Sequence, residues 1–167
     1  PVDQYGIYGV YVALFGILGL FVTTAFPWAA AKYISTETDL KQKYAVLKTA
    51  FAGNILSAII IVAAFYIYST LTSQTGLDTP LTVLLIITVI LYSPLTVYLG
   101  ALQGLFRFRQ LGVMQLLMAV IRLAAGLSLA YLGFGAFGAF AGYLVAAVLT
   151  ILVAAYFLRD FRFWQGP

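Results

Sequence analysis

Arg122 lies well inside a long apolar stretch, where a charged side chain is costly. The stretch GLFRFRQLGVMQLLMAVIRLAAG runs from Gly104 to Gly126, and its first two arginines fall near its polar opening whereas Arg122 does not. An arginine at the centre of a membrane span costs about 2.5 to 3.5 kcal/mol on insertion scales, and such charges usually mark a function or a buried pair. Helical spacing places on one face Gln115, Ala119, Arg122 and Gly126. We therefore expect this face to meet a cavity or a neighbouring helix.

The sequence offers Arg122 no acidic partner inside a predicted membrane span. The acidic residues fall in predicted loops or tails: Asp3, Glu37, Asp39, Asp78 and Asp160. Two interpretations stay open at this point. Either Arg122 ties helices together through backbone carbonyls or water, or it meets an anionic substrate or a helix that this sequence does not contain.

Polar side chains also share a face in two other apolar stretches. Thr88, Tyr92, Thr96 and Gln103 lie within a narrow arc of one predicted helix, and Asn54 shares a face with Ser57 on another. Tyr and Gln side chains both donate and accept hydrogen bonds, as sugar hydroxyls require. Ser and Thr in membrane helices also bond their own carbonyls, so ordinary helix packing is the alternative. The candidate substrate-binding residues are Arg122, Gln115, Tyr92, Thr96, Gln103 and Asn54.

The composition sets the class of protein. The chain is 63% hydrophobic and only 8% charged, with a mean hydropathy of +1.03, so polar groups cannot cover its apolar surface in water. Cysteine and histidine are both absent, which removes thiol nucleophiles, disulfides, imidazole metal ligands and the usual general base. We expect an integral membrane protein that is not an enzyme, with no catalytic residues, no metal, no cofactor and no nucleic-acid partner.

Five segments have the length and apolarity to cross a membrane, namely residues 5–33, 45–68, 80–105, 111–132 and 136–158. Their connections are short, so successive helices should be antiparallel neighbours. Pro94 falls in the middle of the third segment, where it should kink the helix and is a candidate hinge. The predicted fold is an all-α, polytopic membrane helix bundle, with residues 1–167 forming one incomplete transmembrane lobe.

Basic residues indicate the orientation, because Lys and Arg concentrate in cytoplasmic loops. Eight of the nine cations fall on one side once the spans alternate: Lys32, Lys41, Lys43, Lys48, Arg107, Arg109, Arg159 and Arg162. The C-terminal end is therefore predicted to be cytoplasmic and the N-terminal end extracytoplasmic, in a multi-pass protein of the plasma membrane. An extracytoplasmic start predicts a further helix before Pro1. Arg107 and Arg109 form the predicted basic loop, which also suits anionic lipid headgroups.

Two long stretches resemble one family of membrane proteins. YGIYGVYVALFGILGLFVTTAFPWAAAKYIS is similar to the second helix of polysaccharide-biosynthesis proteins, with a Tyr-Gly entry and a Pro-containing exit. The stretch from Leu99 to Leu158 resembles their fourth to sixth helices, with an LQGLGRFR-like loop, an intramembrane arginine and a Gly-rich outer turn. These are the Wzx-type O-antigen and exopolysaccharide flippases of the multidrug/oligosaccharidyl-lipid/polysaccharide superfamily. The family's loop often has Gly where Phe106 stands here.

The resemblance implies a fold and a function. It implies that the chain supplies helices two to six of an N-terminal six-helix lobe, with the first helix and a C-terminal lobe as partners in the same protein. It further implies transport of polyprenyl-pyrophosphate-linked oligosaccharides by alternating access between the lobes. For Arg122 it implies a cationic cavity residue that meets the pyrophosphate or an acidic sugar.

Other functions stay open at this point. Within the same superfamily, a multidrug exporter would need membrane acids for cation coupling, and a lipid II flippase would need a more cationic cavity. A membrane-embedded enzyme would need intramembrane acids or a Ser-His pair, which these spans lack. An assembly or scaffold protein without transport is the remaining alternative.

Overall fold

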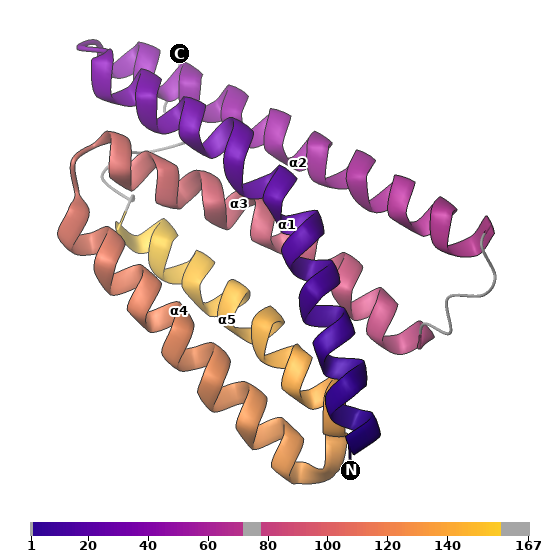
Figure 1. Ribbon diagram of the computed structural model, residues 1–167. Coiled ribbons are helices and arrows are strands. Elements are labelled where there is room, and N and C mark those ends of the chain that lie inside the picture. The colour runs from indigo at the N-terminus through magenta and orange to yellow at the C-terminus, as the bar shows by residue number, and fades with distance from the viewer. Residues whose placement is uncertain (1, 72–77, 158–167) are drawn as a thin grey trace.

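The computed structural model describes residues 2–71 and 78–157, and these are almost entirely helical. Figure 1 shows long helices, of which α5 folds back beside α4. The helices are α1 (Val2–Thr36), α2 (Leu40–Leu71), α3 (Thr79–Gly104), α4 (Phe108–Leu129), a short π-helical turn η1 (Ala130–Phe134) and α5 (Gly135–Phe157). The predicted all-helical bundle is confirmed for the described residues. Arg159, Arg162 and Asp160 lie outside them.

The predicted count of five separate spans is not matched exactly. Within the described residues, four helical segments are long and apolar enough to cross a membrane: Asp3–Thr36, Leu40–Leu71, Thr79–Gly104 and Phe108–Phe157. The last has 50 residues, which as a straight helix would be about 75 Å long, more than twice a hydrocarbon core of about 30 Å. It reverses direction at Gly133, where φ is 98°, so α4 and α5 form a helical hairpin.

The turn between α4 and α5 falls where the sequence predicts one. It lies at the start of the glycine-rich stretch GFGAFG, residues 133–138, where Gly133 leaves the helical conformation. Gly133 and Gly135, with φ of 98° and 54°, supply the reversal that side chains with a Cβ resist. Helices α1 and α2 extend beyond their predicted spans at both ends, and Asp3, expected in a tail, lies in the first turn of α1.

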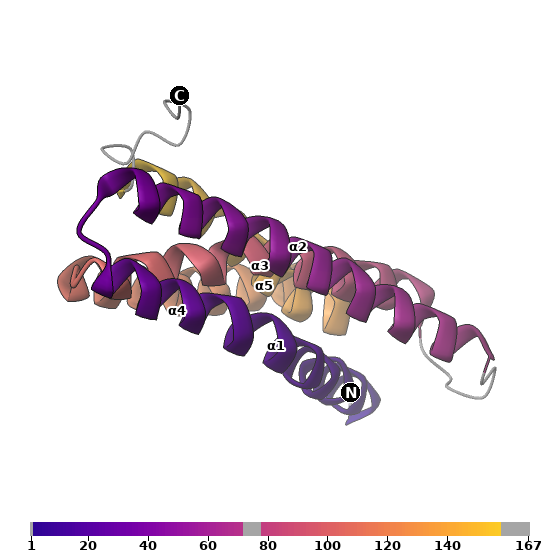
Figure 2. The same cartoon turned by 90° about the horizontal axis from the view of Figure 1, so that it is seen from above.

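The most extensive helix contacts are between α4 and α5 and between α1 and α3. Helix α1 also packs on α2, and α3 also contacts α5. Figure 2 shows α2 along one edge of this view and α1 along the other, with α3 and α5 seen between them. The central position of α3 explains why so many of its residues are buried.

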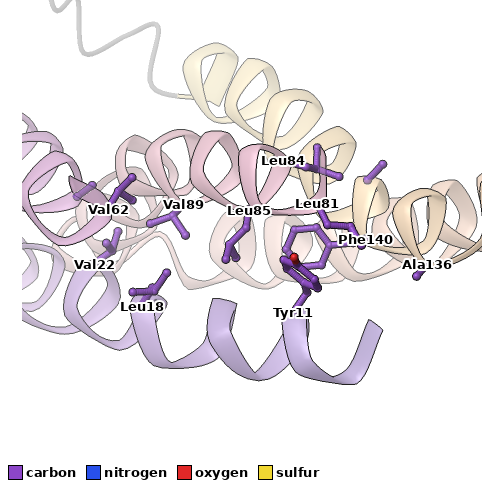
Figure 3. Packing of buried hydrophobic residues seen from close by; sticks show 12 residues of the cluster. Tyr11, Leu18, Val22, Val62, Leu81, Leu84, Leu85, Val89, Ala136 and Phe140 are labelled. Atoms are coloured by element: carbon purple, nitrogen blue, oxygen red, sulfur yellow. The ribbon is translucent and has the colours of Figure 1, made fainter. Parts of the chain in front are cut away.

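The buried residues form two clusters along the bundle. The cluster nearer the start of α1 contains Tyr11 and Phe140, whose rings meet edge to face at 6.2 Å (Figure 3). The hydroxyl of Tyr11 donates to the backbone oxygen of Asp78 at 2.9 Å and lies 3.0 Å from the Thr82 hydroxyl. The other cluster lies nearer the end of α1 and includes Ile34, Leu95 and Met114.

Helix α3 ends in a motif that normally requires glycine. The amide of Arg107 donates to the Leu102 oxygen at 2.9 Å and the amide of Phe106 donates to the Gln103 oxygen at 3.0 Å, which is a Schellman cap. Phe106 occupies its left-handed position with φ of 55°. This explains why glycine is common here in the resembling family, since only glycine adopts that conformation without a Cβ penalty.

Replacing Phe106 by glycine is therefore expected to stabilise the fold. The ring is 67% exposed and contributes little burial, while the left-handed backbone of a non-glycine residue costs about 1 to 2 kcal/mol. We expect a gain of about 1 kcal/mol for Phe106→Gly, measured as a raised unfolding midpoint in detergent micelles. Phe108→Gly, in the first turn of α4, is the matched control and should lower the midpoint. A lower midpoint for Phe106→Gly would contradict the assigned backbone conformation.

Candidate functional site

Two cavities open between the helices. The first, here called the arginine cavity, has a volume of about 540 Å³ and lies between the start of α1 and the α4–α5 hairpin. Its lining includes Gln4, Tyr8, Arg122, Ala139 and Tyr143. The second, here called the glutamine cavity, has a volume of about 350 Å³ and lies between the second halves of α1 and α3 and the first half of α4. Its lining includes Thr23, Trp28, Tyr92, Thr96, Gln103 and Gln115.

The structure thus divides the predicted site between two places. Tyr92, Thr96, Gln103 and Gln115 share the glutamine cavity, although they come from two helices. Arg122 lines the arginine cavity instead, seven residues beyond Gln115 on α4. Two helical turns, about 10 Å along the axis, separate these two side chains, which is enough to place them at different levels of the bundle.

Arg122 packs against an aromatic ring. Its guanidinium carbon lies 4.9 Å from the ring centroid of Tyr143 on α5, a cation–π contact. Within residues 2–71 and 78–157, no acidic side chain forms an ion pair with Arg122. The guanidinium is exposed in the cavity, so its N–H donors remain available to an anion there.

Close helix packing brings Arg122 and Tyr143 together. A Cβ on Gly142 would lie 2.6 Å from the backbone oxygen of Arg122 and 2.7 Å from the amide nitrogen of Gly126. Only a hydrogen at this position allows α5 to approach α4 so closely. The neighbouring Tyr143 then reaches over the arginine. Gly142 therefore lies at a close contact between α4 and α5.

The start of α1 closes one side of the arginine cavity. The side-chain oxygen Oε1 of Gln4 accepts a hydrogen bond from the amide of Ala136 at 2.8 Å. Figure 1 shows the N-terminus beside the α4–α5 turn, as this bond requires. Tyr8, one turn farther along α1, lines the same cavity and interacts with Tyr143.

Asn54 lies in neither cavity. It is 0% exposed, and its side-chain amide donates to the Ser93 oxygen at 2.9 Å and to the Thr96 hydroxyl at 3.1 Å. That hydroxyl also lies 3.2 Å from the backbone oxygen of Val22. The result is a polar clamp that joins α1, α2 and α3 beside Pro94, through which α3 continues without a break.

The two loop arginines differ in their contacts. Arg107 donates from Nη1 to the backbone oxygen of Phe157 at 3.1 Å and so ties the α3–α4 connection to the end of α5. Arg109 is exposed on the first turn of α4. Arg107 therefore has a structural partner that its position in a basic loop did not predict.

Several residues of the cavities were not predicted. Tyr143, Gln4 and Trp28 line them, yet no periodic pattern joins them to the polar faces read from the sequence. The small residues Gly138 and Gly142 were the available signal for Tyr143, because they mark where α5 approaches another helix. Which helix α5 approaches, and therefore whether Tyr143 contacts Arg122, depends on how the α4–α5 hairpin folds.

Aromatic rings fill the space between the two cavities. Phe15 of α1 meets Tyr143, which lines the arginine cavity, and Tyr92, which lines the glutamine cavity, edge to face at 5.1 Å in both cases. The hydroxyl of Tyr92 lies 3.1 Å from the sulfur of Met118 on α4. We call Phe15, Tyr92 and Tyr143 the aromatic partition.

The comparison with protein families now has a structural context. The polysaccharide biosynthesis protein family matches residues 1–166, which is nearly the whole chain. No significant match was found among curated proteins or among solved structures. Together with four apolar helical segments of spanning length, the family match shows that the chain is a multi-pass membrane protein that belongs to the polysaccharide biosynthesis protein family.

Proposed function

We propose that the protein is a flippase that moves polyprenyl-pyrophosphate-linked oligosaccharides across the membrane by alternating access. The family match and the apolar helices support a role in transporting a polysaccharide precursor. In this proposal the chain forms one side of the transport path, and a second lobe of the same protein forms the other.

The observation that carries the proposal is the environment of Arg122. A cation that only stabilised the fold would be expected to bond carbonyls or an acid, because an unpaired charge in a membrane is costly. Here the guanidinium instead faces a cavity of about 540 Å³ with Tyr143 on one side. A pyrophosphate or an acidic sugar would supply the missing negative charge, through the paired hydrogen bonds that arginine forms with such groups.

The other predicted substrate-binding residues would contact the sugar. Tyr92, Thr96, Gln103 and Gln115 line one cavity, and the two glutamine amides supply both donors and acceptors for hydroxyl groups. Asn54 would act indirectly in this proposal, because its amide is used to hold α2 against α3. Transport of this kind requires no covalent chemistry and no cofactor.

The orientation is part of the proposal. The ends of α1 and α3 and the starts of α2 and α4 lie at one end of the bundle, and Figure 1 shows these ends together. They carry the basic residues Lys32, Lys41, Lys43, Lys48, Arg107 and Arg109. The rule that basic loops are cytoplasmic favours placing this end inside the cell, so that Arg122 lies nearer the outer side.

Replacing Arg122 by alanine is the direct test. In a strain that lacks the gene, Arg122→Ala should reduce surface polysaccharide by about tenfold to a hundredfold, because a hydrogen bond to a charged group contributes about 1.5 to 3 kcal/mol. Arg122→Lys keeps the charge without the paired donors and should restore export in part. The measurement is the amount of surface polysaccharide at matched levels of protein in the membrane.

Arg109→Ala is the matched control, since it removes the same charge from an exposed position outside both cavities. It should leave export close to that of the unaltered protein. Full export by Arg122→Ala at normal expression would refute the role of Arg122 in the transport path.

A further inference from the structure

The aromatic partition lies between the glutamine cavity and Arg122. The three rings of the partition come from α1, α3 and α5, and the contact of Tyr92 with Met118 extends the wall to α4. Ring centroids 5.1 Å apart are in van der Waals contact. The two cavities share no lining residue, so they are distinct sites in this conformation.

The chemistry of the glutamine cavity differs from that of its neighbour. No charged side chain is among the residues that line it. Gln103 and Gln115 both line it, and neither side-chain amide is hydrogen-bonded within the described part of the chain. Each amide offers two donors and an acceptor oxygen, so the pair matches ligands that carry hydroxyl groups rather than ligands that carry charge.

An aromatic surface completes this cavity. Trp28 lines it, is 72% exposed, and has no ring partner among the described residues. The apolar C–H face of a sugar ring packs on such an indole, while the sugar hydroxyls need partners of both kinds at the edge. The volume of about 350 Å³ is at the lower end of the range, about 300 to 1,000 Å³, in which small organic ligands bind.

We propose that the glutamine cavity is a separate binding site for uncharged sugar residues, with Trp28 as the stacking surface and Gln103 and Gln115 as the hydroxyl partners. This proposal rests on the proposed function, because it takes the transported oligosaccharide as the ligand. It adds that the sugar and the anionic group occupy different cavities, with the partition between them. A ligand that carries both groups would place its sugar in one cavity and its anionic group in the other.

Protection of single cysteines from a thiol reagent tests the proposal. The 167-residue sequence contains no cysteine, so Thr23→Cys reports on the glutamine cavity and Ala139→Cys on the arginine cavity. Both changes are small and avoid the proposed contact residues. Two probes come from the cell's own lipid-linked oligosaccharide: the glycan released by mild acid, and polyprenyl pyrophosphate without sugar.

The released glycan should slow modification of the Thr23→Cys variant and leave the Ala139→Cys variant unaffected. Adding Trp28→Leu should weaken that protection by about twofold to tenfold, the effect expected from loss of one aromatic contact. Phe21→Leu is the matched control, because Phe21 is an exposed aromatic residue of α1 that lines neither cavity. The proposal would be overturned if the glycan did not protect the Thr23→Cys variant or protected both variants equally. It would also be overturned if Trp28→Leu left the protection unchanged.

The second probe separates this proposal from the proposed function. Polyprenyl pyrophosphate should protect the Ala139→Cys variant, and Arg122→Ala should abolish that protection. Failure of this arm alone would count against the anionic contact at Arg122 and not against the sugar site. Protection of Thr23→Cys by polyprenyl pyrophosphate would overturn the separation of the two cavities.

Discussion

Replacing Asn54 by aspartate is expected to destabilise the protein by about 3 kcal/mol or more, because it places an uncompensated charge in a buried position. The side chain is 0% exposed, and its amide donates to the Ser93 oxygen and the Thr96 hydroxyl. Aspartate has the same shape, but a carboxylate oxygen would replace the amide nitrogen that donates to the Ser93 oxygen. Two acceptors would then face each other. The measurement is the free energy of unfolding in detergent micelles, obtained from denaturant titration.

Asn54→Leu separates the charge from the hydrogen bonds. It removes the clamp without adding charge and should cost about 1 to 2 kcal/mol, the usual range for a hydrogen bond between membrane helices. The Ser93 oxygen keeps the hydroxyl of Thr96 as a donor at 2.8 Å, which limits the loss. Equal stability of the aspartate and leucine variants would show that position 54 is open to water or to a cation.

The same pair of variants bears on function. If Asn54 only stabilises the fold, export by the Asn54→Leu variant should fall only in proportion to the amount of folded protein. Export that is lost while folded protein stays constant would instead make Asn54 a direct contact of the transported molecule.

Replacing Gly142 by alanine is expected to destabilise the protein by about 1 to 3 kcal/mol, the usual cost of overpacking. The new Cβ would lie 2.6 Å from the Arg122 oxygen and 2.7 Å from the Gly126 nitrogen, and both atoms belong to the backbone of α4. Neither can rotate away, so the two helices must separate. That separation would also pull Tyr143 from the guanidinium, so export should fall together with stability. The measurements are the unfolding midpoint in micelles and surface polysaccharide in the deletion strain.

Gly16→Ala is the matched control, because a Cβ at Gly16 would meet nothing within 4 Å. Alanine in a helix interior is otherwise favoured over glycine by about 0.5 to 1 kcal/mol, so this variant should be neutral or more stable. The two substitutions are chemically identical and are expected to act in opposite directions. A stabilising effect at both positions would contradict the close contact between α4 and α5.

The hydropathy pattern predicted the helices well and their ends less well. Spans expected at residues 45–68 and 80–105 correspond to Leu40–Leu71 and Thr79–Gly104. Helix α2 begins five residues earlier than expected, since Asp39 accepts a hydrogen bond from the Lys41 amide at its start and polar residues continue the helix beyond the apolar core. The turn expected between residues 132 and 136 is present, because Gly133 and Gly135 reverse the chain between α4 and α5.

The polar faces were predicted from periodic patterns. Each pattern correctly identified which residues of a single helix lie on the same side. Tyr92, Thr96 and Gln103 do lie along one side of α3, and Gln115 joins them from α4. Their separation from Arg122 follows from Phe15 and Tyr143, residues on two further helices. Periodicity specifies which side of a helix is polar, but it contains no information about which helix lies opposite.

The sequence by itself determined that the chain is helical, that it belongs in a membrane and which family it resembles, because hydropathy, helical period and family motifs are all local along the chain. Only the tertiary structure decided that Arg122 lies over Tyr143, that Asn54 is a clamp and that the polar residues occupy two cavities. Each of these depends on contacts between helices far apart in sequence, and such contacts are determined by shape at positions such as Gly142, where one methyl group decides how closely two backbones approach.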